Sequence, residues 1–191
     1  QATASWMIRE DKIKVVVVGH DCRFGGELFS EAVAKVMAAN GIKVFLAKGF
    51  VSTPMVSFGA LRVSAGAGII ITASHNHAFY NGYKLKGGYG GPLLEEDIIE
   101  IEKLIPDTNP IKLEEIYLET LHEQELLKYI DLETKYCEHL TDHFDVEAIL
   151  SSEEALQAVK RNSKIDAIIL DIVMPGMDGF MHLEKIKKEK L

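Results

Sequence analysis

The stretch KIKVVVVG (residues 12–19) decides the fold class of this chain. Its run of valines ending in glycine is typical of a strand that is buried on both faces, as in a parallel sheet covered by helices. Amphipathic helix patterns follow at residues 26–41 and 53–63, and strand patterns at residues 42–49 and 67–73. This alternation predicts an α/β fold with three α/β/α layers and a mainly parallel sheet.

The pattern changes after Pro92. Charged amphipathic stretches at residues 93–106 and 114–144 predict a helical connector that carries no chemistry. The α/β signals then return as a partial flavodoxin-like βαβα segment, with strands expected at residues 145–150 and 165–171 and helices at residues 151–162 and 179–190. We therefore predict two parts, residues 1–144 and residues 145–191.

The composition argues against several classes of function. The 191 residues carry a net charge of -8, which argues against a nucleic-acid partner because clustered lysine and arginine hold phosphate backbones. The longest apolar runs are far shorter than the ~20 residues of a membrane span, and we expect no signal peptide. We expect no membrane association and a cytoplasmic location. The two cysteines, Cys22 and Cys137, lie far apart and lack metal-ligand spacing.

A polar loop follows the third predicted strand, in the stretch ITASHNHAFYNGYKLKGGYGGP (residues 71–92). A serine hydroxyl needs a nearby base and positive charge for phosphoryl or acyl transfer, and His75 and Lys84 could supply them beside Ser74. An asparagine–glycine pair predicts a turn that returns Lys84 toward the serine. The later glycines could bring backbone N–H groups close to an anion. The alternative is a hairpin with a solvated polar tip, in which the histidines and glycines have no chemical role.

The motifs of this loop resemble those of a known family. TASHN, followed by YNGYK and GG, closely resembles the active-site serine loop of the α-D-phosphohexomutases, the phosphoglucomutase/phosphomannomutase family. VVVVGHDCRFGGE resembles the GxDxR strand and loop of that family, and AKGFVSTPMVSFG resembles its G…TP segment. The resemblance covers roughly residues 1–144, which would be most of the family's first domain.

The resemblance implies roles for individual residues. Ser74 would hold the transferable phosphoryl group, whose phosphate would be one ligand of a Mg²⁺ ion, and Lys84 would be the general acid/base near the sugar. His75 is assigned with them as catalytic, and Asn76 and Arg23 as residues that bind substrate or phosphate. The complete enzyme would interconvert hexose 1-phosphate and hexose 6-phosphate through a hexose bisphosphate, a phosphoryl transfer that depends mainly on positioning and charge neutralisation.

Arg23 admits two interpretations. Within GHDCRFGG (residues 19–26) it could pair with Asp21 across a tight turn, or it could bind a ligand. Between these we favour structural support of the serine loop.

The sequence also departs from the family pattern. Where the family usually has SHNP, this chain has His77, so a rigid residue is replaced by a titratable one. The arginine-bearing phosphate loop expected before Gln1 and the aspartate-rich metal loop DGDxDR do not occur in the sequence. We therefore expect the isolated chain to be an inactive serine-loop domain.

The C-terminal part resembles a different family. IDAIILDIVMPGMDGF (residues 165–180) resembles the phosphoacceptor segment of a response-regulator receiver domain. In this interpretation Asp171 accepts a phosphoryl group from a histidine kinase, whereas in the alternative Asp171 only ends a strand. The two resemblances meet between about residues 145 and 152, which predicts a chimera. Two alternatives to mutase chemistry follow, a receiver-like signalling segment and an inactive chimeric α/β domain.

Overall fold

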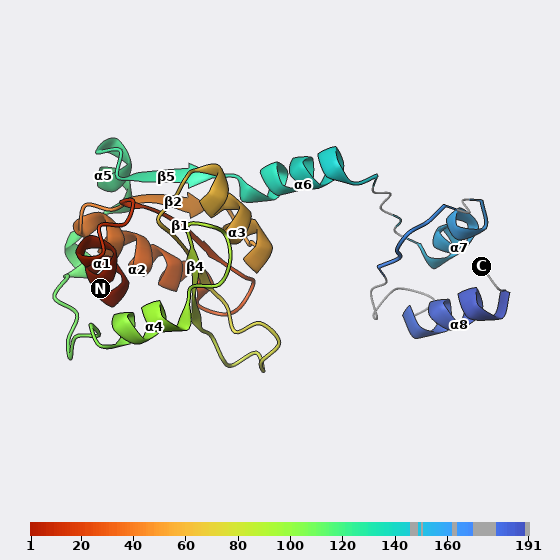
Figure 1. Ribbon diagram of the computed structural model, residues 1–191, viewed down its shortest axis with the longest axis horizontal. Helices are drawn as coiled ribbons and strands as arrows, with labels where there is room; N and C mark the ends of the chain where they lie inside the picture. The colour runs from red at the N-terminus through yellow and green to blue at the C-terminus, as the bar shows by residue number, and fades with distance from the viewer. Residues whose placement is uncertain (146–148, 150, 162–163, 170–178, 190–191) are drawn as a thin grey trace. The chain divides into compact units, whose positions relative to one another are not determined.

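The computed structural model describes residues 1–145, 149, 151–161, 164–169 and 179–189 (Figure 1). The chain divides into two compact units, Gln1–Leu140 and Thr141–Leu191. Among the described residues, no helix is both long enough and apolar enough to cross a membrane.

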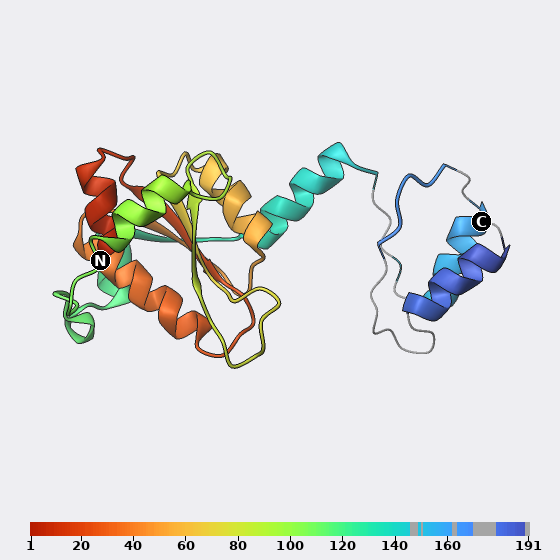
Figure 2. The same ribbon diagram turned by 60° about the horizontal axis from the view of Figure 1, so that its bottom comes forward.

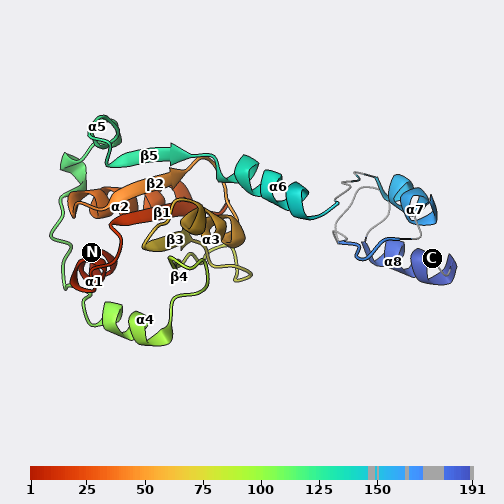
Figure 3. The ribbon, with the colours of Figure 1, turned by 45° about the horizontal axis from the view of Figure 1, so that its top comes forward.

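A five-stranded sheet forms the centre of the first unit, with the strand order β4-β3-β1-β2-β5. The strands are β1 (Val15–His20), β2 (Lys43–Ala47), β3 (Ala67–Ile71), β4 (Tyr83–Gly87) and β5 (Leu127–Ile130). The central strand β1 pairs in parallel with β2 and β3, and β5 extends the sheet in parallel beside β2. β4 alone runs antiparallel, against β3. Figure 3 shows the five strands side by side, so the predicted mainly parallel sheet is confirmed.

Helices cover both faces of this sheet. They are α1 (Ala2–Arg9), α2 (Gly26–Ala39), α3 (Thr53–Arg62), α4 (Glu95–Glu102), the short 3-10 helix η1 (Leu113–Glu115), α5 (Leu118–Glu123) and α6 (Leu132–His143). One hydrophobic cluster joins one face of the sheet to α1, α2, α4 and α5. A second cluster joins the other face to α3 and the start of α6. Figures 1 and 2 show α1 beside α4. The predicted α/β/α layers are therefore confirmed.

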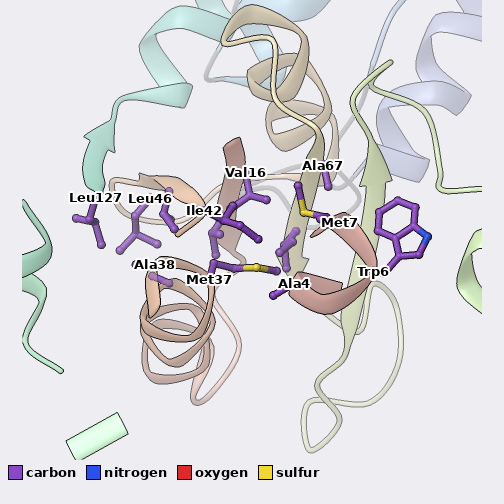
Figure 4. Close-up of a cluster of buried hydrophobic side chains, with 14 of the residues drawn as sticks. Ala4, Trp6, Met7, Val16, Met37, Ala38, Ile42, Leu46, Ala67 and Leu127 are labelled. Atoms are coloured by element: carbon purple, nitrogen blue, oxygen red, sulfur yellow. The ribbon is translucent and has the colours of Figure 1, made fainter. Parts of the chain in front are cut away.

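The valines of β1 are buried on both faces. Val16 and Val18 belong to the first cluster and Val17 to the second, as expected from the alternation of side chains along a strand. Figure 4 shows the first cluster, in which Met37 of α2 reaches toward Ala4 of α1. The continuous valine run therefore reflects a strand with an apolar layer on each side.

The structure differs from the sequence prediction within residues 114–144. Here Leu127–Ile130 forms the edge strand β5, although the whole stretch was predicted to be helical. The backbone groups on the outer edge of β2 need hydrogen-bond partners, and β5 supplies them while burying Leu127 and Ile130. Tertiary pairing therefore overrides the local helical pattern.

The second unit contains two helices among its described residues, α7 (Ser152–Arg161) and α8 (Gly179–Glu189). The strand predicted at residues 145–150 falls mostly outside the described residues, and so does Asp171. A buried strand was predicted at residues 165–171. The prediction is wrong for the described part of this range, because residues 164–169 are exposed and form no strand. Ile169 is 99% exposed. The described residues of this unit include no strand with which this segment could pair.

Leu132, at the start of α6, should stabilise the first unit. Its side chain is fully buried and lies over Gly59, where an added Cβ atom would come within 2.6 Å of it. Leu132→Ala should lower the free energy of unfolding by about 2–5 kcal/mol through lost burial and a cavity. Urea unfolding followed by the fluorescence of Trp6, the one tryptophan of the chain, measures this unit. The control is Leu28→Ala on α2, which is 68% exposed and should cost less than about 0.5 kcal/mol. Equal effects of the two substitutions would contradict the packing of α6 on this sheet.

Tyr83 should make the first unit sensitive to alkali. The residue as a whole is 45% exposed, but its hydroxyl group donates a hydrogen bond to Thr3 Oγ1 at 3.0 Å, and burial raises the pKa of Tyr83 to about 12. Between pH values of about 10 and 12 the unfolded chain loses this proton and the folded chain keeps it, so the free energy of unfolding falls as pH rises. Tyr83→Phe should reduce that fall. Urea unfolding of both proteins at a series of pH values tests this, and parallel curves would refute it.

Candidate active site

The candidate site lies where β1 and β3 end. These parallel strands pair His20 with Ile71, so the residues that follow them meet at the carboxyl edge of the sheet. The Asp21 N–H continues the ladder by donating to the Ile71 carbonyl at 3.2 Å. This edge is where open α/β sheets bind ligands. The chain between β3 and β4, residues 72–82, is the serine loop and projects from this edge (yellow in Figures 1 and 2).

Asp21 and Thr72 form the base of the site. The Thr72 hydroxyl donates to Asp21 Oδ2 at 2.5 Å and accepts a hydrogen bond from the Ser74 N–H at 3.0 Å. Thr72 is only 4% exposed, whereas Ser74 and the residues up to Tyr80 are exposed. Ser74 has a backbone φ of 55°, in the left-handed region. The buried threonine therefore anchors an exposed serine that has an unusual backbone conformation.

Arg23 gathers the serine loop around its guanidinium group. Its backbone N–H donates to Asp21 Oδ1 at 3.0 Å, and its Nε atom lies 3.4 Å from Asp21 Oδ2. Its Nη atoms donate to four loop carbonyls, those of Ser74 at 2.7 Å, Asn76 at 2.6 Å, His77 at 2.9 Å and Tyr80 at 3.0 Å. The structure thus shows the pairing with Asp21 and contacts to the loop. A direct role of Arg23 in binding phosphate stays a prediction.

His75 lies next to the serine hydroxyl. Its Nδ1 atom is 3.4 Å from Ser74 Oγ, and both side chains are exposed. The neighbouring Asn76 donates its backbone N–H to the Ala73 carbonyl at 3.0 Å, which closes a tight turn. A nucleophile, a titratable nitrogen and an amide side chain therefore share one turn at the end of β3.

Lys84 returns beside the end of β3, as the predicted turn requires. It pairs with Ile70 in the antiparallel ladder and is exposed. The ladder is prolonged by a hydrogen bond from the Thr72 N–H to the Gly82 carbonyl at 2.9 Å. The Asn81 amide donates to the Phe24 carbonyl at 3.1 Å and ties the serine loop to the loop after β1. The backbone therefore brings Ser74 and Lys84 to the same end of the sheet.

The later glycines do not take part in this arrangement. Gly87 pairs with Ala67, which begins β3, whereas Ser74 follows the other end of that strand. The prediction that glycines 87, 88, 90 and 91 bring backbone N–H groups to an anion near Ser74 is therefore wrong. The antiparallel direction of β4 carries these glycines toward the opposite edge of the sheet.

Two features were not foreseen from the sequence. Thr72 takes part in the site because the strand register places it beside Asp21. The only sign of this role in the sequence is that a hydroxyl residue directly follows an apolar strand. His77 stacks on Phe79 with a centroid separation of 4.8 Å, and Phe79 is 91% exposed. The position where the family usually has proline thus carries an aromatic stack on the surface of the loop.

The described residues offer no ready-made metal site. They contain no group of three or more His, Cys, Asp or Glu side chains that could hold an ion. Asp21, the carboxylate nearest to Ser74 in this network, already accepts hydrogen bonds from Thr72 and Arg23. The residues present therefore do not by themselves fit the Mg²⁺ ion that the resemblance implies.

Several known proteins are similar to this chain in sequence or in fold. A phosphoglucomutase from Staphylococcus saprophyticus is 36% identical over 119 residues, which are 62% of this chain and 22% of that protein. A phosphoglucosamine mutase from Leuconostoc mesenteroides is 40% identical over 99 residues, 52% of this chain and 22% of that protein. A crystal structure assigned to a phosphomannomutase of Thermus thermophilus is 34% identical, with a TM-score of 0.64, and the match covers 75% of this chain and 30% of that one. The chain thus spans about a quarter of the length of these proteins.

Two family descriptions match different parts of the chain. Residues 129–191 match the response regulator receiver domain, in agreement with the resemblance of the C-terminal segment. The junction between the two parts, expected between about residues 145 and 152, stays a prediction. Residues 1–111 match domain I, the alpha/beta/alpha domain, of the phosphoglucomutase/phosphomannomutase description. The chain therefore belongs to the phosphoglucomutase/phosphomannomutase family.

Proposed function

We propose that Ser74 carries the phosphoryl group in the interconversion of hexose 1-phosphate and hexose 6-phosphate. The observation that supports this most is an exposed serine hydroxyl on a loop that Arg23 and Thr72 hold at the carboxyl edge of the sheet. The phosphoserine would pass its phosphoryl group to a hexose monophosphate hydroxyl, giving a bisphosphate and a free serine. The Ser74 hydroxyl would then attack the other phosphate, lose its proton and release the isomeric monophosphate.

His75 and Lys84 would accept and donate the protons in this exchange. The 3.4 Å between His75 Nδ1 and Ser74 Oγ is slightly longer than a good hydrogen bond, a separation that commonly shortens when a substrate binds. Lys84 projects from β4 at the same edge and is exposed to a ligand. We assign Lys84 as the acid/base toward the sugar and Asn76 as a polar contact to substrate.

A Mg²⁺ ion, when bound, would neutralise charge on the transferred phosphoryl group. A phosphate on Ser74 would supply one ligand, and the described residues contain no group of three or more His, Cys, Asp or Glu side chains that would supply the rest. Because the matched segment is 22% of the phosphoglucomutase relative, the full reaction is proposed for the whole enzyme. The chain of 191 residues is proposed to carry the serine loop without mutase turnover.

The receiver-like segment is a second candidate phosphoryl acceptor. The match over residues 129–191 supports it, with Asp171 as the acceptor and a histidine kinase as the donor. Asp171 lies outside the described residues, and the exposed segment 164–169 before it does not form the strand that this role requires. We therefore rank it below the serine loop. The cytoplasmic setting and the absence of a nucleic-acid partner stay predictions.

Incubation with glucose 1,6-bisphosphate and Mg²⁺ should add one phosphoryl group, about 80 Da, to Ser74. Intact-mass spectrometry and peptide mapping measure the product, and Ser74→Ala should abolish it. Ser64→Ala is the matched control, because Ser64 also has a left-handed backbone, with φ of 51°, but lies before β3 at the opposite edge. An unlabelled wild-type chain would refute phosphoryl transfer to Ser74 in this chain.

Lys84→Met should slow this labelling roughly 100-fold or more, which is the usual contribution of a positioned acid or base. Lys86→Met is the control, because Lys86 lies on the same face of β4, two residues nearer the opposite edge. Quenched-flow labelling followed by mass spectrometry gives both rates. Equal rates in the two variants would show that Lys84 acts only as a surface charge.

A further inference from the structure

The backbone of Ser74 is held in a conformation that its side chain disfavours. Its φ of 55° lies in the left-handed region, where the Cβ atom of any residue other than glycine crowds the backbone. Such conformations persist only where surrounding contacts fix them, and they concentrate at functional sites. Some group must therefore hold Ser74 in place.

Both main-chain polar atoms of Ser74 are bound. Its N–H donates to Thr72 Oγ1 at 3.0 Å, and its carbonyl accepts a hydrogen bond from Arg23 Nη2 at 2.7 Å. These two contacts fix the peptide groups on either side of the serine. The direction of the hydroxyl group follows from them, because the Cα–Cβ bond is set by the backbone.

The two partners of Ser74 share one carboxylate. Asp21 Oδ2 accepts the Thr72 hydroxyl proton at 2.5 Å and lies 3.4 Å from Arg23 Nε, while Asp21 Oδ1 accepts the backbone N–H of Arg23. A hydroxyl group that gives its proton to a carboxylate keeps only lone pairs for its other neighbours. Asp21 therefore makes Thr72 an acceptor toward Ser74 and orients the guanidinium group at the same time. Linked hydrogen bonds of this kind strengthen one another.

We propose that Asp21 is a positioning residue for phosphoryl transfer at Ser74, and that it acts through Thr72 and Arg23. The inference rests on the proposed role of Ser74 in the reaction. It predicts that loss of the Asp21 charge leaves the fold in place but lets the serine backbone relax. The rate of transfer then falls because the nucleophile spends less time in its reactive orientation.

The chain contains a matched control for this network. Asp131 also follows a parallel strand, β5, and its carboxylate accepts the backbone N–H and the hydroxyl proton of Thr134, each at 3.0 Å. These contacts lie at the start of α6, away from the serine loop in the sheet order. Asp131→Asn therefore removes the same charge and the same kind of contact without touching Ser74.

The test uses the full chain with Asp21→Asn, Thr72→Val, Thr72→Ser and Asp131→Asn. Amide hydrogen exchange of Ser74, measured by NMR, reports on its backbone without any phosphoryl donor. Labelling by glucose 1,6-bisphosphate and Mg²⁺ over a range of sugar concentrations separates the maximal rate from the half-saturating concentration. Trp6 fluorescence checks that each variant is folded.

Asp21→Asn and Thr72→Val should each speed Ser74 amide exchange roughly 5- to 10-fold, the effect of one lost hydrogen bond. Each should lower the maximal labelling rate roughly 10- to 100-fold with little change in the half-saturating concentration. Thr72→Ser, which keeps the hydroxyl group, and Asp131→Asn should stay close to the wild type. The double variant with Asp21→Asn and Thr72→Val should be little worse than the slower single variant, since both act on one network.

The outcomes separate this inference from the proposed function. If the wild-type chain is not labelled, phosphoryl transfer to Ser74 in this chain is refuted, and amide exchange alone decides whether Asp21 positions the serine. If Asp21→Asn matches Asp131→Asn in both measurements, the inference is overturned. Independent, multiplicative effects of Asp21→Asn and Thr72→Val would also overturn it, because Asp21 would then not act through Thr72.

Discussion

The parallel pairing of β1 with β3 is the constraint on which the rest of the site depends. Because His20 lies opposite Ile71, the next residues of the two strands, Asp21 and Thr72, meet at the edge of the sheet. A slip of one residue would still leave the valines of β1 between two apolar layers, but it would separate these two side chains. The polar network therefore requires this particular register, whereas burial of the valine run does not.

The interactions that stabilise the serine loop differ from those that stabilise the sheet. Residues 74–80 are exposed, so apolar burial contributes little to their conformation. Four of their carbonyls instead point at one guanidinium group, whose flat, branched shape lets a single side chain bind several acceptors. Lysine, with a compact ammonium group, could not reproduce this geometry. A charged guanidinium group therefore lies at the centre of the loop, whereas apolar side chains fill the core of the domain.

Much of the fold was predictable because burial leaves a clear mark on the sequence. The valine run of β1 and the isoleucine run of β3 predict strands that are covered on both sides, and the structure contains both strands. β5 was missed because the residues LKYI carry no strand pattern, and the strand forms only where β2 offers an edge. Residues 164–169 show the opposite error: their sequence predicts a strand, but they stay exposed and the described residues of this unit provide no partner strand.

The candidate site was predictable to a similar degree. Ser74, His75 and Lys84 are marked by residue type and by a turn signal, and the structure places their backbones at one edge. Thr72 could not be singled out, because its importance comes from the strand beside it rather than from its neighbours in the chain. The glycines at residues 87–91 were misplaced because a motif read along the chain ignores the reversal of β4.

The left-handed backbone of Ser74 has an evolutionary consequence. Glycine would adopt this conformation without steric cost, and it is the default residue at such a position. Here it would remove the hydroxyl group that the proposed chemistry needs. Selection for a more stable loop and selection for a reactive one therefore act in opposite directions at this residue. The polar network around Asp21 lets the chain keep the serine without giving up the turn.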